Sequence, residues 1–334
     1  MYNRSNMALG PHPEFSWSSS RARTFRYCKR QYWFQYYGHW NGWEDRAPER
    51  TRTVYRLKQL QSLATWAGSS VHRGVSILLS TDRPVADVVD EIHQQMRREY
   101  LSSVRRVFQQ PRRAKSFGLD VHEYDQDLPK ERFARMWERV EECLKTFPDL
   151  PYQAACRQAR AAGSFVHVED PDERDFDAKR FRWDEIGDFP IYAIPDMAYQ
   201  RPDGRVEILD WKTGREPTNR PKDEPTLQLV LYARFLKAKY PDLPAIHDFE
   251  VAEVYLPSGQ RYGAPLDEAH LERATRAVAE SVDSMRGLLD DPVRNVATED
   301  RFGLIEDRRG CRWCVFRAVC PAWPGDDGVA GEGG

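Results

Sequence analysis

The segment IPDMAYQRPDGRVEILDWKTG, residues 194–214, decides how we expect this chain to fold. Runs rich in apolar, β-branched and aromatic residues cover 189–199 and 205–211, and both predict strands. Between them, Pro202-Asp203-Gly204 is typical of a tight turn. The segment therefore predicts a hairpin of two neighbouring strands.

This hairpin carries two carboxylates and a lysine, Asp196, Asp210 and Lys212. Because strand side chains alternate between two faces, Asp210 and Lys212 share a face and Trp211 points into the packing on the other. Two acids can hold a hard divalent cation, while a lysine orients or deprotonates water and offsets the charge of a phosphate. The alternative is a surface salt bridge on an ordinary hairpin, since Asp-x-Lys is a common triplet.

Working outward, the first half of the chain has apolar residues at helical spacing, and the second half mixes strands with helices. The predicted helices are 53–79, 85–108, 131–147, 226–240 and 268–289, and the further predicted strands are 164–169 and 249–256. We find no internal repeat. This order predicts an α/β core with a large helical insertion or cap.

The charges are balanced overall but unevenly placed. The 334 residues include 50 basic and 52 acidic ones, a net charge of −2, yet residues 1–60 carry +7 and residues 97–115 carry +6. Acids gather between Glu169 and Asp210. This pattern suits an enzyme that grips phosphates with one part and holds metal with another, although solvated helix faces would give the same totals.

The termini and hydropathy indicate a cytoplasmic protein. Residues 1–17 contain no apolar core of a secretory signal, and no apolar run approaches the roughly 18 residues of a membrane span. We therefore expect no membrane association. Cytoplasmic thiols stay reduced, so clustered cysteines indicate metal rather than disulfides.

Four short motifs follow one another along the chain, GSSVH at 68–72, IPD at 194–196, ILDWKTG at 208–214 and QLVLYA at 228–233. In this order they resemble the RecB-like branch of the PD-(D/E)xK nuclease superfamily. The resemblance implies a restriction-endonuclease-like α/β core, in which helices flank a central mixed sheet, preceded by a helical N-terminal region.

The resemblance also implies an active site that binds Mg²⁺ or Mn²⁺. The implied metal ligands are His72, Asp196, Asp210 and the carbonyl group of Trp211. Lys212 would be the catalytic lysine, and Gln228 and Tyr232, one helical turn apart, would lie beside the site to contact DNA or hold the lysine. Glu169, near the end of the preceding predicted strand, is a further candidate acid. Without the other motifs, His72 would be interpreted as a buried structural histidine.

The sequence Cys311-x2-Cys314-x5-Cys320 is a compact group of three thiols that needs a fourth ligand to complete a metal site. Cys143 and Cys156 lie in helical stretches among core positions and are interpreted as packing residues. By resemblance to the iron–sulfur subgroup of these nucleases, which includes AddB nuclease domains and CRISPR-associated exonucleases, Cys28 supplies the fourth ligand of a [4Fe–4S] cluster. Such a cluster would clasp the two ends of the nuclease domain, since Cys28 and Cys311 are 283 positions apart. A zinc ion on the same four thiolates is the alternative.

Residues 26–43 interleave basic and aromatic side chains. We expect Arg26, Lys29 and Arg30 to contact phosphates of a nucleic acid, and most of the rings to belong to the core.

We expect a single RecB-like nuclease domain with disordered ends. The expected divisions are 1–15 disordered, 16–324 nuclease domain, 45–160 helical region, 161–260 catalytic α/β core, 261–324 C-terminal helix with the cysteines, and 325–334 disordered.

These observations predict a magnesium- or manganese-dependent DNA nuclease that acts as an exonuclease or end-processing enzyme, favours single strands, and serves DNA repair, recombination or antiviral defence. The sequence has no Gly-x4-Gly-Lys-Ser/Thr loop for ATP, so a helicase or a defence-system protein is an expected partner. One alternative is a catalytically weak iron–sulfur subunit that binds DNA within a larger complex. Another is a zinc-bearing scaffold without a role in nucleic acid chemistry.

Overall fold

The computed structural model describes residues 11–110, 117–124, 130–173, 175 and 177–323. The disorder expected for 1–10 and 325–334 lies outside this range. Residues 11–15 differ from the expected disorder, because Phe15 is buried with the Arg286 guanidinium 5.1 Å from its ring centroid, and His12 Nε2 donates to the Tyr36 carbonyl at 2.9 Å.

The chain divides into two compact units, each built from separated segments. The first unit comprises Met1–Gln61, Ser102–Tyr124 and Glu280–Gly334, and the second comprises Ser62–Leu101 and Asp125–Ala279.

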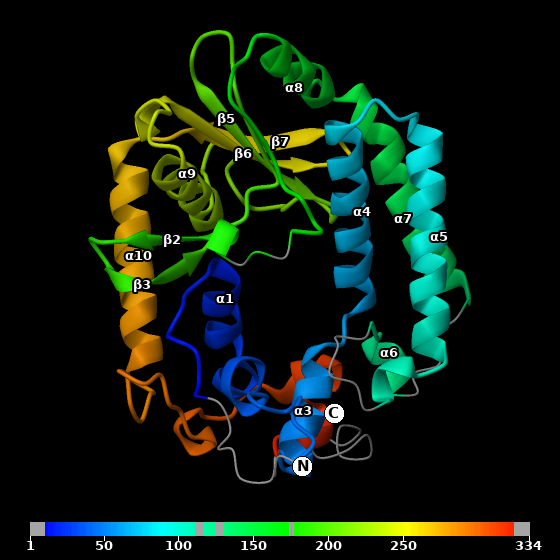
Figure 1. Ribbon diagram of the computed structural model, residues 1–334, viewed down its shortest axis with the longest axis vertical. Helices are drawn as coiled ribbons and strands as arrows, with labels where there is room; N and C mark the ends of the chain where they lie inside the picture. The colour runs from blue at the N-terminus through cyan, green and yellow to red at the C-terminus, as the bar shows by residue number, and fades with distance from the viewer. Residues whose placement is uncertain (1–10, 111–116, 125–129, 174, 176, 324–334) are drawn as a thin grey trace, which may run out of the picture. The chain divides into compact units, whose positions relative to one another are not determined.

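The second unit is organised around a five-stranded sheet in the order β1-β4-β5-β6-β7 (Figure 1). Its strands are β1 Val166–Val168, β4 Met197–Gln200, β5 Val206–Lys212, β6 Phe249–Tyr255 and β7 Gln260–Pro265. The β5–β6 pair is parallel and the other pairs are antiparallel. The expected α/β core with a mixed sheet is therefore confirmed, and the turn at 202–204 joins β4 to β5 as predicted.

Helices cover both faces of this sheet. On one face, the Tyr232 hydroxyl of α9 (Leu227–Lys239) donates to Asp210 of β5 at 3.2 Å. On the other face, the next residue of β5, Trp211, contacts Tyr152 of α8 (Tyr152–Ala161). Because neighbouring strand residues point to opposite faces, α9 and α8 lie on opposite sides of β5. The connection through α9 allows β5 and β6 to run parallel.

Three further helices of the second unit are amphipathic, as their spacing predicted. α4 (Leu63–Ser80) packs against α7 (Lys130–Thr146), and Gly74 makes the close approach possible because a Cβ there would lie 2.5 Å from Leu144 Cδ2. α5 (Val85–Val104) buries Val88, Ile92 and Met96. The short 3₁₀ turns of this unit are η4 Phe147–Asp149, η5 Asp177–Lys179 and η6 Ile246–Asp248.

The prediction of one continuous strand over 189–199 is wrong, because the structure has two separate strands there. β3 (Gly187–Tyr192) pairs with β2 (Arg180–Trp183) in a separate two-stranded sheet, and β4 begins only at Met197. The break falls at 193–196, where Pro195 has no N–H group to donate to a ladder. β2 and β7 were not predicted.

The first unit contains short helices and turns. They are α1 Ser19–Tyr27, α2 Lys29–Trp33, the π-helix η2 Phe34–Gly38, α3 Glu49–Lys58, η3 Val107–Gln109, α6 Asp120–Glu123, η7 Glu299–Arg301, η8 Arg308–Trp313 and η9 Arg317–Val319. α10 (Glu268–Arg286) contributes residues to both units.

The predicted helix over 53–79 is two helices, α3 and α4. The Gln61 amide donates to the Gly118 carbonyl at 2.9 Å, and the Gln61 carbonyl accepts from the Asp120 amide at 3.0 Å. Ser62 then caps α4 by accepting from the Thr65 amide. The helix predicted over 85–108 likewise ends at Val104, because Arg106 adopts a left-handed conformation with φ of 53°.

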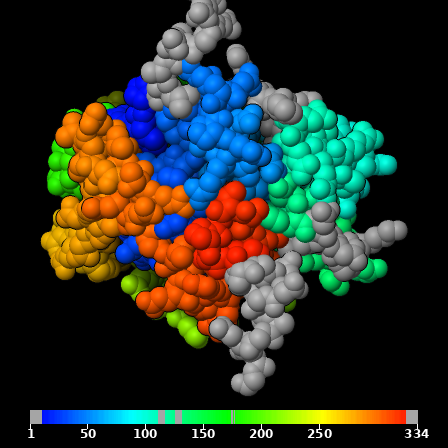
Figure 2. Space-filling view, turned by 90° about the horizontal axis from the view of Figure 1, so that it is seen from below, coloured from blue at the N-terminus to red at the C-terminus, as the bar shows by residue number. Residues whose placement is uncertain are grey.

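Segments from the two ends of the chain pack together within the first unit. The Arg30 guanidinium donates to Glu299 at 2.7 Å and to the Phe302 carbonyl at 2.8 Å, and the Tyr37 hydroxyl donates to Asn295 at 2.9 Å. Figure 2 shows this arrangement, with N-terminal residues in blue beside C-terminal residues in orange and red. A hydrophobic cluster of the same unit comprises Phe34, Val54, Leu57, Leu60, Phe108 and Phe316.

None of the helices described combines the length and the apolar composition that a membrane span requires.

Candidate active site

A histidine and two carboxylates converge in the second unit. His72 lies on α4, Glu169 directly follows β1, and Asp196 directly precedes β4. One ligand atom from each lies within 4.8 Å of the others, and no other trio in the described part of the chain meets that spacing. His72 Nδ1 is 2.9 Å from Asp196 Oδ1.

The backbone fixes this trio. The Glu169 amide donates to the Asp196 carbonyl at 2.9 Å, which extends the β1–β4 pairing by one step. The Trp211 amide donates to Asp196 Oδ2 at 2.6 Å, so the aspartate is tied to β5 beside Asp210. A nitrogen and two carboxylates form a donor set that fits a divalent cation such as Mg²⁺ or Mn²⁺.

Asp210 lies next to this trio without being part of it. Its side chain is buried, with Oδ2 in an ion pair with Lys212 Nζ. Oδ1 accepts from the Tyr232 hydroxyl at 3.2 Å and from Gln228 Nε2 at 3.4 Å, and Gln228 also donates to the Tyr232 hydroxyl. The two α9 residues therefore orient Asp210, and the hydrogen bonds of their side chains go to Asp210 and to each other.

Burial and crowding shift the protonation of this group. Burial and the Asp196 carboxylate raise the pKa values of both Glu169 and Asp210. Burial opposes a charged His72, but Asp196, Asp210 and Glu169 outweigh it and raise the pKa of His72 to about 9. A cation bound here would compete with the protons that these raised pKa values favour.

Lys212 is held in its charged form. Burial favours the neutral amine, but the carboxylates of Asp210 and Glu253 outweigh it and raise the pKa of Lys212. Lys212 Nζ lies 3.7 Å from Glu253 Oε1. Lys212 can thus offset negative charge nearby.

Trp211 is placed as the alternation of strand side chains predicted. Its ring contacts Phe147 and Tyr152 on the face opposite Asp210. The role of its carbonyl group as a metal ligand stays a prediction.

Sequence reasoning missed Glu253 and Arg220. Glu253 on β6 pairs in register with Asp210, and its buried carboxylate accepts from Arg220 Nη1 at 2.5 Å. The Arg220 guanidinium lies 5.2 Å from the Tyr262 ring centroid. The sequence did show Glu253 as an acid inside an otherwise apolar strand. Only the parallel pairing of β5 with β6 reveals that it lies beside Lys212.

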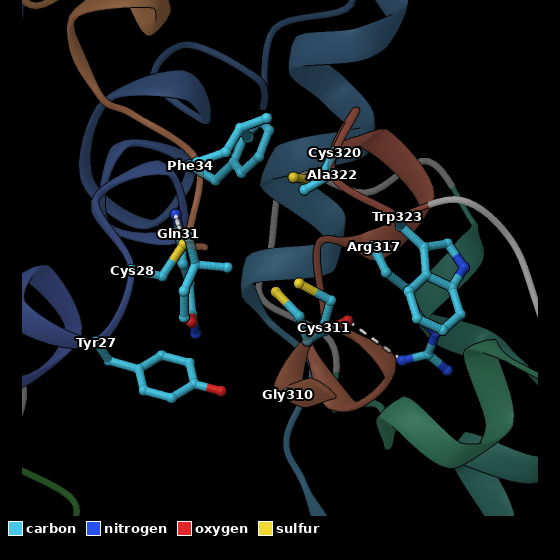
Figure 3. A pocket seen from close by; sticks show the side chains of 13 residues that line it. Tyr27, Cys28, Gln31, Phe34, Gly310, Cys311, Arg317, Cys320, Ala322 and Trp323 are labelled. Atoms are coloured by element: carbon cyan, nitrogen blue, oxygen red, sulfur yellow. Dashed lines mark hydrogen bonds between the residues drawn. The ribbon is translucent and has the colours of Figure 1, made fainter. Parts of the chain in front are cut away.

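The first unit brings four cysteines to one pocket (Figure 3). Cys28, Cys311, Cys314 and Cys320 line it, and all four are free thiols. Burial raises the pKa of Cys314 to about 12 and also raises the pKa values of Cys311 and Cys320, which favours the neutral thiols. Cys143 and Cys156 are fully buried elsewhere, as expected of packing residues.

The three basic residues expected to contact phosphates differ in exposure. Arg26 and Lys29 are exposed. Arg30 is buried and donates to Glu299 and Phe302, so its guanidinium stabilises the first unit and does not face solvent. Most rings of this segment are buried or half-buried, whereas Tyr27 is 54% exposed.

The comparison with protein families agrees with this chemistry. A family model described as the PD-(D/E)XK nuclease superfamily matches residues 16–321. No curated protein matches the chain. A solved structure described as "Crystal structure of SSO0001" is 13% identical and matches 61% of this chain and 92% of its own, with a TM-score of 0.22.

Proposed function

The chain belongs to the PD-(D/E)XK nuclease superfamily, and from this premise we propose that it is a magnesium- or manganese-dependent deoxyribonuclease. The observation that carries the proposal is the juxtaposition of the His72, Glu169 and Asp196 trio with the Asp210–Lys212 ion pair at one end of the sheet. The substrate we propose is DNA with single strands or free ends. The products would be a 5′-phosphate and a 3′-hydroxyl.

The residues divide the work. His72, Glu169, Asp196 and Asp210 would hold the cation, which when bound would polarise the phosphate and lower the pKa of the attacking water. Lys212, held charged by two carboxylates, would neutralise the phosphate and orient water rather than accept a proton. Gln228 and Tyr232 keep Asp210 in position.

A cleavage assay tests this proposal. Purified protein is incubated with 5′- and 3′-labelled single and double strands in Mg²⁺, Mn²⁺ or EDTA. We expect metal-dependent cleavage, reduced about 10²- to 10⁴-fold by Lys212→Ala and by Asp210→Asn, with DNA binding retained. Lys145→Ala, which changes an exposed lysine, is the matched control. Unchanged cleavage by both active-site variants would contradict the proposal.

We further propose that the four cysteines hold a [4Fe–4S] cluster. They line one pocket, which joins Cys28 to the three thiols near the other end of the chain. Four thiolates are the usual ligands of a [4Fe–4S] cluster and also of a structural zinc ion, so the metal content decides between the two. A brown protein containing iron and sulfide supports this assignment, and a colourless protein with stoichiometric zinc contradicts it.

The biological setting we propose is DNA repair, recombination or antiviral defence, beside a helicase or a defence-system protein. Reproducible co-purification of such a partner from the native host would support this, and a fully active protein that always purifies alone would count against it.

A further inference from the structure

A groove of the first unit adjoins the cysteine pocket. It lies between the end of α1 with the start of α2 on one side and residues 301–307 on the other. Tyr27, Arg26, Lys29, Arg301, Glu306 and Asp307 contribute its aromatic and charged side chains. None of the catalytic candidates of the second unit belongs to it.

Basic side chains dominate this groove. Arg26, Lys29 and Arg301 are exposed, and Arg301 uses one donor on the Gly287 carbonyl at 3.0 Å. Of the two acids, Asp307 is already paired, because Arg309 donates to both of its oxygens at 2.6 to 3.0 Å. The groove is therefore suited to an anionic chain.

Tyr27 adds a ring that is fixed in place with a free surface. It is 54% exposed and lines the cysteine pocket (Figure 3), and it also lines the groove. The Tyr27 hydroxyl packs against the 308–313 turn, because a Cβ atom added to Gly310 would lie 1.9 Å from the hydroxyl oxygen. A large exposed aromatic beside cations is how proteins stack unpaired bases while pairing the phosphates between them.

We propose that this groove binds single-stranded DNA, with a base on Tyr27 and phosphates on Arg26, Lys29 and Arg301. The inference rests on the proposed nuclease function and deepens it. It assigns the first unit the task of holding the strand, while the second unit carries the cleavage chemistry. A base inside a duplex is stacked between its neighbours and has no free face for the ring, so a duplex gains from the cations but not from Tyr27.

The cations are tested by salt dependence. Binding of a labelled single-stranded oligodeoxynucleotide is followed by anisotropy, using the full chain with Asp210→Asn to prevent cleavage. The combined variant Arg26→Ala/Lys29→Ala/Arg301→Ala should flatten the slope of log K against log salt by about 2, since each phosphate contact contributes about 0.7. Lys145→Ala/Arg273→Ala/Arg276→Ala removes the same charge from exposed positions of the second unit and should leave the slope unchanged.

The ring is tested by a pair of variants. Tyr27→Ala should weaken single-strand binding about tenfold, and Tyr27→Phe, which keeps the ring and loses the hydroxyl, should retain it. The affinity for duplex DNA should be the same in Tyr27→Ala and Tyr27→Phe. Equal metal content and melting temperature show that the cysteine pocket is intact.

Two results would contradict the proposal that the groove binds single-stranded DNA. One is an equal salt slope in the two triple variants, and the other is an equal loss of single-strand affinity in Tyr27→Ala and Tyr27→Phe. The nuclease proposal fails separately. If the unmutated protein does not cleave DNA but the groove variants lose binding, the DNA-binding proposal is supported and the nuclease proposal is contradicted. If the unmutated protein cleaves DNA and the groove variants bind normally, the nuclease proposal is supported and the DNA-binding proposal is contradicted.

Discussion

At the scale of single residues, Asp210 shows why position matters as much as charge. Lys212 occupies one of its oxygens, and Tyr232 and Gln228 donate to the other. Burial and the neighbouring Asp196 raise the pKa of Asp210, because both make its charged form less favourable. A cation bound beside it would stabilise that charged form. Its partners come from β5 and α9, and together they hold the carboxylate next to the trio of His72, Glu169 and Asp196.

Glu253 provides the first test at this scale. Its carboxylate accepts from Arg220 and lies 3.7 Å from Lys212, so we expect it to position the lysine. Glu253→Gln should lower kcat about 10- to 100-fold with little change in the Kd for DNA, as for other groups that orient a reacting residue. Steady-state kinetics and anisotropy measure the two quantities.

The control for this change lies on the same strand. Glu250 pairs with Arg201 and Arg261, and its odd separation from Glu253 puts it on the other face of β6. Glu250→Gln should leave kcat unchanged. Equal effects of the two substitutions would show that Glu253 acts only through the stability of the strand.

At the scale of elements, β7 approaches β6 closely at Gly263. A Cβ at this position would lie 1.9 Å from the Val251 carbonyl oxygen, which is backbone and cannot turn away. Gly263→Ala should lower the free energy of unfolding by about 1 to 3 kcal/mol through overpacking. Chemical denaturation measures the loss.

Gly68 on α4 is the matched control, because its nearest atom would be Thr213 Oγ1 at an ordinary 3.7 Å. Gly68→Ala should raise stability by about 0.5 to 1 kcal/mol, the gain in helix propensity. If Gly68→Ala lowered the free energy of unfolding as much as Gly263→Ala, the effect at Gly263 could not be assigned to the close contact between β7 and β6.

The end of the π-helix η2 predicts a dependence on pH. Burial, with Lys58 2.7 Å from its Nε2, lowers the pKa of His39 to about 3. The unfolded histidine titrates near 6.5, so the unfolded state binds more protons below that pH and the stability contribution is lost as pH falls toward 3. At pH 5 the loss should be about 2 kcal/mol.

Thermal melts of the unmutated protein and His39→Gln at pH 7 and pH 5 isolate this contribution. The glutamine keeps a neutral acceptor for Lys58 but cannot be protonated, so its melting temperature should fall less. Parallel falls in the two proteins would show that His39 is not the group responsible.

At the scale of the whole molecule, the first unit joins both ends of the chain before any metal is considered. Arg30, Tyr37 and Trp33 each donate to residues of 295–302. A cluster on Cys28 and Cys311 would add a cross-link over 283 positions, with a contribution of about 4 to 5 kcal/mol by analogy with disulfides.

Cys28→Ser should therefore abolish iron binding and lower the melting temperature without unfolding the protein, because the polar contacts and the aromatic core remain. Iron analysis and thermal melts measure the two effects. Cys156→Ala, at a buried packing position, should keep its iron. Full iron content in Cys28→Ser would show that the fourth ligand is another residue.

The sequence by itself determined what depends on local patterns. Turn residues and a period of two predicted β5 and the turn before it, and the same period set Asp210 and Lys212 on the face opposite Trp211. The order of the motifs indicated the superfamily, and close spacing in the chain singled out Cys311, Cys314 and Cys320. Each of these follows from residues that are close in the chain or that carry distinctive chemistry.

Tertiary structure alone decided the rest. The parallel pairing of β5 with β6 brought Glu253 to Lys212, packing against Glu299 removed Arg30 from solvent, and backbone pairing at Gln61 divided one predicted helix into two. These outcomes depend on which distant segments meet, and periodicity shows which side of an element is buried but not against what. The local motif was enough to single out Lys212, whereas its second carboxylate, Glu253, comes from a distant strand and could not be predicted.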